Sequence, residues 1–266
     1  MQTFVLECGS APLLVSLPHD GTFVPEEMAA RLTAPARALP DTDWHVGRLY
    51  AIARALDASI LRPYASRYVV DLNRAPDGAA LYPGRRETGL VPLRTFADEP
   101  VWREGAAPDT TEVSARVDAW WRPYHAALAG ELARLRRRHP RVVLWEGHSI
   151  RSQVPMLFDG RLPDYNLGTA GGASCDVALR DALGAQLARF DDRTHAVDGR
   201  FKGGWITRHY GRPQDGVHAV QLELAQCTYM DEDSFAWDED GASRVQREIG
   251  RLLRECVRFA AAAGPA

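Results

Sequence analysis

The sequence has few cysteines and no long apolar run. Its four cysteines, Cys8, Cys175, Cys227 and Cys256, fit neither a disulfide scaffold nor the short spacing of a zinc knuckle. No segment approaches the roughly 18 consecutive apolar residues that a membrane-spanning helix needs. The first nine residues lack the basic start and apolar stretch of a secretory signal. We therefore expect reduced thiols, no membrane partner and a cytoplasmic location.

Linkers and a strong net charge are also absent. No stretch rich in proline, glycine or serine is long enough to separate two cores, so we expect one domain spanning residues 1–266. The formal net charge is −3, which creates no large attractive potential for nucleic acid or anionic lipid. We expect no nucleic-acid partner, and the sequence carries no signal for a particular oligomeric state.

Short apolar runs alternate with amphipathic stretches along the chain. The apolar runs predict strands at residues 12–17, 59–61, 67–72, 141–145, 194–197 and 217–224. Helical spacing predicts helices at residues 43–56, 112–138, 175–189 and 241–261. Asp41, Thr42 or Asp43 could cap the first of these helices. This order predicts an α/β fold with a mixed, largely parallel sheet and helices on both faces.

A long stretch between two of these elements has no sustained period. Residues 73–105 are rich in proline, glycine and charged side chains, which predicts a long functional loop. In open α/β sheets, ligands bind beyond the carboxyl ends of the strands. We therefore expect a ligand site at the carboxyl ends of the strands.

Two histidines follow strand-like runs. His19 and His148 should project at the same edge of the sheet, where they could share one metal ion. A catalytic zinc often takes two histidines and one carboxylate. The candidate acids are Asp20, Asp43 and Glu146, and spacing alone does not choose among them.

One carboxylate lies inside a predicted strand. Glu223 alternates with leucines and shares a strand face with Gln221. A carboxylate there is costly unless it is paired or catalytic. Glu223 could take a proton from an attacking water and return it to a leaving amine. The alternative is an ion pair at the edge of the strand.

Cationic residues follow the predicted strands. Asn73 and Arg74 come directly after one of them, and the planar fork of Arg74 suits a carboxylate. Residues 201–211 place Lys202 and Arg208 among glycines. That segment predicts a flexible anion-binding loop or, alternatively, an exposed basic hairpin.

Six short blocks in this order resemble the N-formylglutamate amidohydrolase family of histidine breakdown, itself similar to the zinc carboxypeptidase and aspartoacylase group. The blocks are residues 16–21 (SLPHDG), 41–44 (DTDW), 70–74 (VDLNR), 146–150 (EGHSI), 201–211 (FKGGWITRHYG) and 221–224 (QLEL). The resemblance spans almost the whole chain. It implies a zinc-carboxypeptidase-like fold and the hydrolysis of N-formyl-L-glutamate to formate and L-glutamate.

The resemblance also implies roles for individual residues. They are metal binding for His19 and His148, the general base for Glu223, and substrate binding for Asn73 and Arg74. The carboxypeptidase group has a glutamate three residues after its first histidine, a position that Thr22 occupies here. We predict Asp43 as the replacement ligand and a divalent ion, zinc first, as the cofactor.

The implied substrate is a small acidic N-acyl amino acid with two carboxylates. Two carboxylates need two cationic contacts, so we pair Arg74 with Arg208 or Lys202. Which cation meets which carboxylate stays open.

Three other functions fit parts of the pattern. The first is a metallohydrolase for another N-acyl acidic amino acid. The second is a serine hydrolase using Ser149, although Arg151 stands where the nucleophile elbow has its second glycine. The third is a binding module for a metal or an amino acid without turnover, in which Glu223 would have no role as a base.

Overall fold

A computed structural model describes residues 2–81, 84 and 86–262 of the chain. Within these residues, seven strands form one sheet in the order β1-β3-β2-β4-β7-β5-β6. The strands are β1 (Phe4–Glu7), β2 (Leu13–Ser16), β3 (Ser59–Pro63), β4 (Val142–Ile150), β5 (Tyr165–Gly168), β6 (His195–Val197) and β7 (Val217–Ala225). The four central strands β3, β2, β4 and β7 run parallel, while β1 and β5 join antiparallel. The predicted mixed, largely parallel sheet is confirmed.

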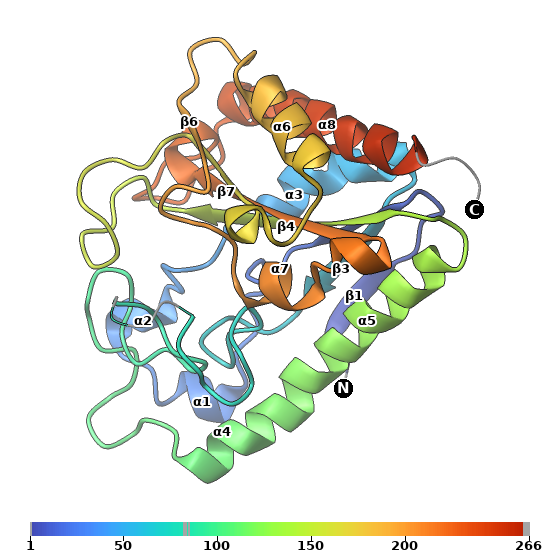
Figure 1. Ribbon diagram of the computed structural model, residues 1–266. Coiled ribbons are helices and arrows are strands. Elements are labelled where there is room, and N and C mark those ends of the chain that lie inside the picture. The colour runs from blue at the N-terminus through green and yellow to red at the C-terminus, as the bar shows by residue number, and fades with distance from the viewer. Residues whose placement is uncertain (1, 82–83, 85, 263–266) are drawn as a thin grey trace.

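The helices cover both faces of this sheet (Figure 1). They are α1 (Glu26–Ala29), α2 (Ala34–Arg37), α3 (Val46–Leu49), α4 (Thr110–Arg116), α5 (Arg122–Arg136), α6 (Val177–Leu187), α7 (Trp205–Tyr210) and α8 (Glu239–Ala261). A 3-10 helix, Tyr50–Leu56, continues α3, and a π-helical turn, Val117–Trp121, joins α4 to α5. None of the helices in the described part of the chain combines the length and apolar character needed to cross a bilayer.

Strand alternation divides the core into two layers. Leu13, Val15 and Trp145 pack with α3, α6 and α8 on one face. The intervening residues, such as Leu14 and Leu144, pack with α5 on the other face. Helix α7 lies against β4 and β7 on this second side (Figure 1). The second face carries the candidate site at its carboxyl edge.

One predicted strand is absent. Residues 67–72 form a turn and irregular backbone instead of a strand. Arg67 and Asp71 are both buried and form an ion pair of 2.7 Å. Residues four apart on a strand lie about 13 Å apart, so this pair requires a bent backbone. The burial of two opposite charges overrides the β-propensity of Val69 and Val70.

The start of the first predicted helix also differs. The helix begins at Val46, and His45 occupies the N-cap with a φ of 62° and no side-chain cap. None of the three proposed cap residues, Asp41, Thr42 and Asp43, caps it. The carboxylate of Asp43 instead faces β4, where it accepts a hydrogen bond from the backbone N–H of Ser149 (3.1 Å).

Strand β4 is longer than predicted. It runs through Ile150, so Glu146 and His148 lie within the strand and not in a loop after it. The strands β1 and β5 and the short helices α1, α2 and α7 were not predicted. The long loop after Asn73 is confirmed, since its described residues hold isolated bridges but no helix or strand. Residues 82, 83 and 85 of that loop, and residues 1 and 263–266 of the predicted domain, lie outside the described residues.

Candidate active site

The pairing of β4 with β7 assembles the floor of the site. Glu146 is the register partner of Gln221, and His148 is the register partner of Glu223. Since alternate residues of a strand share a face, these four side chains lie on the same side of the sheet. Gly147, between the two β4 residues, faces the opposite layer, where a Cβ would lie 2.7 Å from Leu17 and from Tyr50. Glycine therefore lets β4 pack closely at this point.

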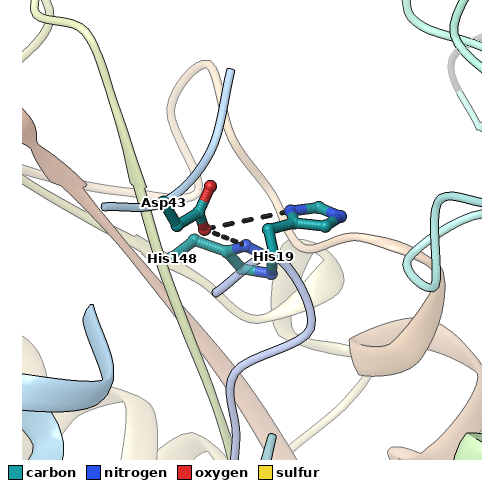
Figure 2. A group of neighbouring side chains, drawn as sticks. All are labelled: His19, Asp43 and His148. Atoms are coloured by element: carbon teal, nitrogen blue, oxygen red, sulfur yellow. Dashed lines mark hydrogen bonds and ion pairs between the residues drawn. The ribbon is translucent and has the colours of Figure 1, made fainter. Parts of the chain in front are cut away.

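His19 and Asp43 reach the same place from two loops. Their segments are tied by a hydrogen bond from the Asp43 backbone N–H to the His19 carbonyl (3.1 Å). Asp43 Oδ2 lies 3.0 Å from Nδ1 of His148 and 3.8 Å from Nδ1 of His19, as the dashed lines in Figure 2 show. The three potential ligand atoms all lie within 4.8 Å of one another, and all three residues are buried.

Each histidine has a carboxylate next to its Nε2 atom. Nε2 of His19 lies 2.7 Å from Oδ1 of Asp71, and Nε2 of His148 lies 2.7 Å from Oε1 of Glu146. A carboxylate accepts a hydrogen bond from Nε2–H, so each Nδ1 is left as the basic nitrogen. Metal-binding histidines commonly have such carboxylate partners. The donor set therefore fits a divalent ion held by two Nδ1 atoms and Asp43.

These carboxylate partners refine the sequence prediction. Glu146 was a candidate ligand, but it lies behind His148, and its Oε2 accepts hydrogen bonds from the hydroxyl and the backbone N–H of Thr207. Asp20 lies outside the group, bound to the backbone N–H of Gly47 and to Arg62. Sequence reasoning missed Asp71. Asp71 lies in the block of residues 70–74, two residues before Asn73, and this position could have suggested it as a site residue.

Burial and charge set the protonation of the two histidines. Burial lowers the pKa of His19, and the positive charge of Arg67 lowers it further. The negative charge of Asp71 acts in the opposite direction but does not outweigh them. Burial would also lower the pKa of His148, but Glu146 and Asp43 together hold it well above its ordinary value. The surroundings therefore favour the neutral form of His19 and the protonated form of His148.

Asp71 is itself strongly anionic. Burial alone would raise its pKa, but His19 and Arg67 hold the pKa well below its ordinary range. Its oxygens accept hydrogen bonds from Arg67 and from the backbone N–H of Asn73 (2.8 Å). Asp71 thus joins the His19 side of the cluster to the segment that carries Asn73 and Arg74.

Glu223 lies beside this cluster on β7. Burial raises its pKa to about 8, with Asp43 adding to the rise and His148 opposing it. Its Oε2 accepts a hydrogen bond from Gln221 Nε2 (3.2 Å). It has no salt bridge with a lysine or arginine among the described residues, so the alternative of a strand-edge ion pair is not what the structure shows. A buried carboxyl with a raised pKa suits proton transfer near neutral pH.

His19, Asp43, His148 and Glu223 line one cavity of about 600 Å³, a volume that includes its opening to solvent. Among the described residues, three arginines also line it: Arg67, Arg74 and Arg200. Arg74 is fixed by hydrogen bonds from Nε to the Thr88 carbonyl (2.8 Å) and from Nη2 to the Thr88 hydroxyl (3.1 Å). Arg200, which donates from Nε to the Leu157 carbonyl (2.8 Å), was missed by sequence reasoning. Arg200 directly precedes the block of residues 201–211, and this position in the sequence could have suggested its role.

Lys202 and Arg208 are placed differently from the prediction. Both residues are exposed, and neither is among the described residues that line the cavity. The segment is not a hairpin, because residues 201–204 lead into helix α7, which covers Trp205–Tyr210. The backbone N–H groups of Ile206 and Thr207 point inward to Asn73 and Glu146. Arg208 donates from Nε to the Gly203 carbonyl (3.0 Å) and does not line the cavity.

Asn73 lines the cavity but is held within the protein. Its Oδ1 accepts the backbone N–H of Ile206 (2.9 Å), and its own backbone N–H donates to Oδ1 of Asp71 (2.8 Å). A Cβ at Gly204 would lie 2.2 Å from the side-chain amide nitrogen of Asn73. The glycine is what allows α7 to approach Asn73 so closely.

Ser149 does not have the partners of a catalytic serine. Its hydroxyl oxygen lies 2.7 Å from the Tyr229 hydroxyl and 3.4 Å from Nε2 of Gln226. A histidine base is not among its hydrogen-bond partners in the described residues, although such a base is what activates a serine nucleophile. The geometry gives the serine hydrolase interpretation no support.

Comparison with known proteins identifies one family. The model of the N-formylglutamate amidohydrolase family matches residues 11–230. An N-formylglutamate deformylase of Pseudomonas aeruginosa is 53% identical over 252 residues, which cover 94% of each chain. An N-formylglutamate deformylase of Pseudomonas putida is 48% identical over 254 residues, which cover 95% of each chain.

Two solved structures share the fold. The N-formylglutamate amidohydrolase from Ralstonia eutropha JMP134 has a TM-score of 0.85 and 26% identity, covering 99% of this chain and 100% of that one. A protein of Agrobacterium tumefaciens has a TM-score of 0.72 at 18% identity, covering 97% of this chain and 96% of that one, and shows the likeness of fold alone. The match to the family model and the near full-length identity to the two relatives place this chain in the N-formylglutamate amidohydrolase family.

Proposed function

We propose that this chain is an N-formylglutamate deformylase, which hydrolyses N-formyl-L-glutamate to formate and L-glutamate with the help of a divalent metal ion. Family membership and the names of two close relatives support the reaction. The observation that carries the metal dependence is the convergence of His19, Asp43 and His148 in a buried group. We further propose that residues 1–266 form a single metallo-amidohydrolase domain that works in the cytoplasm.

The metal ligands in this proposal are Nδ1 of His19, Nδ1 of His148 and the carboxylate of Asp43. Two nitrogens and one oxygen make a set that zinc accepts in hydrolytic enzymes, so zinc is the ion we propose. When bound, the ion would supply a Lewis acid that polarises the formyl carbonyl and acidifies a water molecule. Asp71 and Glu146 orient the two imidazoles by holding their Nε2–H groups.

Glu223 is the general base in this mechanism. It lies across from His148 in the β4–β7 register and lines the same cavity, so it is placed beside the reacting centre. Glu223 takes the proton of the attacking water and then gives it to the glutamate nitrogen as the C–N bond breaks. The same carboxyl therefore acts first as a base and then as an acid.

Arginines at the cavity account for an acidic substrate. Arg74 and Arg200 both line it, and each could meet one of the two carboxylates of the glutamyl group. Arg67 is already engaged with Asp71, so its charge is balanced within the protein. We therefore propose Arg200, and not Lys202 or Arg208, as the second cationic contact to a substrate carboxylate. Substrate contact by Asn73 stays a prediction.

A formate-release assay on metal-loaded protein tests this proposal. The substrates are N-formylglutamate, N-formylglutamine, N-formylmethionine and N-acetylglutamate. We expect N-formylglutamate to exceed the two neutral formyl substrates by about 30-fold or more in kcat/KM, the effect of an unpaired cation in the site. Higher acetate release from N-acetylglutamate would instead identify a hydrolase for another acyl group. An absence of turnover with every substrate would favour a binding module.

A further inference from the structure

Residues 72–74 form an irregular segment that carries Asn73 and Arg74, two of the residues proposed to bind substrate. Because the segment is not a strand, its carbonyl groups have no sheet partners. All three carbonyl oxygens nonetheless accept hydrogen bonds. The donors are His125 Nε2 to Leu72 (2.9 Å), the Trp205 backbone N–H to Asn73 (3.4 Å) and Trp121 Nε1 to Arg74 (3.0 Å). Two of the three donors are side chains of one continuous helical stretch.

Trp121 is the last residue of the π-helical turn between α4 and α5. Pro123, two residues further on, has no N–H to donate to the carbonyl of Ala119, which disfavours a regular α-helical turn here. Turns of this kind change the direction of the side chains they carry, and they are frequent at functional sites. Here the neighbouring tryptophans separate, with Trp120 packing near Phe23 and Trp121 bonding to Arg74.

His125 stands one turn further along α5 and stacks on Trp121, with ring centroids 3.8 Å apart. Burial lowers the pKa of His125 to about 3, so the neutral ring carries a single N–H. The Leu72 carbonyl can only accept, which puts that proton on Nε2. Nδ1 therefore accepts from the hydroxyl of Tyr210, which is 3.0 Å away in α7.

The guanidinium of Arg74 is fixed at the same time as its backbone. Among the described residues, Nε, Nη1 and Nη2 each make one hydrogen bond, to Thr88 or to the Asn73 carbonyl. Five N–H groups are present in the fork, so two remain for a carboxylate. A cation held in this way loses little conformational freedom when a ligand binds.

We propose that Trp121 and His125 are positioning residues for substrate binding. By bonding to the Arg74 and Leu72 carbonyls, they hold the backbone from which Arg74 and Asn73 enter the cavity. The inference rests on the proposed function. Both side chains act through this backbone, and neither is among the residues that line the cavity.

The test compares Trp121→Phe with Trp120→Phe. The first substitution removes the indole N–H that bonds to Arg74 and keeps an aromatic ring, while the second changes the neighbouring tryptophan, which is equally buried at 7% exposure. For Trp121→Phe we expect KM for N-formylglutamate to rise roughly 5- to 10-fold, the worth of one hydrogen bond. We expect kcat to change less than about 3-fold, metal content to stay equal, and the preference over N-formylglutamine to fall.

Hydrogen exchange at the backbone amides of Asn73 and Arg74 provides a readout that needs no turnover. It should be faster in Trp121→Phe and unchanged in Trp120→Phe. Equal KM, equal substrate preference and equal exchange in the two variants would overturn the positioning role, as would parallel losses in both. A wild-type chain that releases no formate would reject the proposed function, and the exchange comparison would then still decide whether Trp121 holds this segment.

Discussion

Oδ1 of Asp71 lies 2.7 Å from Nε2 of His19, on the side of the ring that faces away from Asp43. A buried carboxylate at this position fixes the tautomer of His19 and turns its Nδ1 toward the cluster. The same oxygen accepts the backbone N–H of Asn73. One side chain therefore orients a proposed metal ligand and the start of a proposed substrate segment.

Asp71→Asn should weaken metal binding about 10- to 100-fold, the usual effect of removing a carboxylate behind a ligand histidine. The measurement is the metal dissociation constant by competition with a chelating dye. Asp41→Asn is the control, because Asp41 is similarly buried and accepts from Tyr68 and Phe96, without contact to His19. Equal metal affinity in wild type and Asp71→Asn would remove Asp71 from the support of the site.

Glu223→Gln should keep the metal and the fold while kcat falls on the order of 10²–10⁴-fold, because an amide cannot accept the proton of the attacking water. Single-turnover formate release on metal-loaded protein measures this directly. Gln221→Ala serves as a comparison, since it removes the hydrogen bond to Glu223 but leaves the carboxylate in place. A kcat near the wild-type value in Glu223→Gln would exclude the base role.

Arg200→Met should lower the preference for N-formylglutamate over N-formylglutamine by about 30-fold or more, because one substrate carboxylate loses a charge-assisted contact. Arg208→Met should change the same ratio less than about 2-fold, since Arg208 is exposed and lies outside the cavity lining. The ratio of kcat/KM values for the two substrates decides between them. The reverse pattern would restore Arg208 as the second substrate contact.

His125 should make the fold sensitive to acid. Burial holds its pKa at about 3, below the ordinary value of 6.5, so the unfolded chain binds more protons between those pH values. The free energy of unfolding that the neutral, buried His125 contributes is fully present above pH 6.5 and is lost as the pH falls toward 3. Between pH 7.5 and 5.5, wild type should lose about 1.4 kcal/mol more unfolding free energy than His125→Gln. Urea unfolding at both pH values gives the difference, and parallel losses would show that His125 does not titrate as described.

Much of the fold could be predicted from the sequence because periodicity reports burial. The runs at β2, β4 and β7 and the pattern of α8 indicated the central strands and a covering helix. The irregular segment around Arg67 and Asp71 could not be predicted in this way, because its shape depends on an ion pair between buried charges. Tertiary pairing overrode local propensity there.

The site was predictable where a residue type already implies a chemistry. His19, His148 and Glu223 stand out as polar groups beside apolar runs, and the structure brings them to one cavity. Asp71, Arg200, Trp121 and His125 were missed because their roles depend on contacts between distant segments. Lys202 and Arg208 were chosen for their charge alone, and charge does not report which way a short helix turns its side chains.

Titration of metal-free protein with zinc shows whether turnover depends on the bound metal ion. Formate release from N-formylglutamate is measured at each step, together with bound metal by elemental analysis. We expect no turnover in the metal-free protein and activity that rises in proportion to bound metal, up to one ion per chain. In His19→Ala and His148→Ala, both the bound metal and the activity should be lost. Full turnover in rigorously metal-free wild type, or full metal binding in both variants, would contradict these expectations.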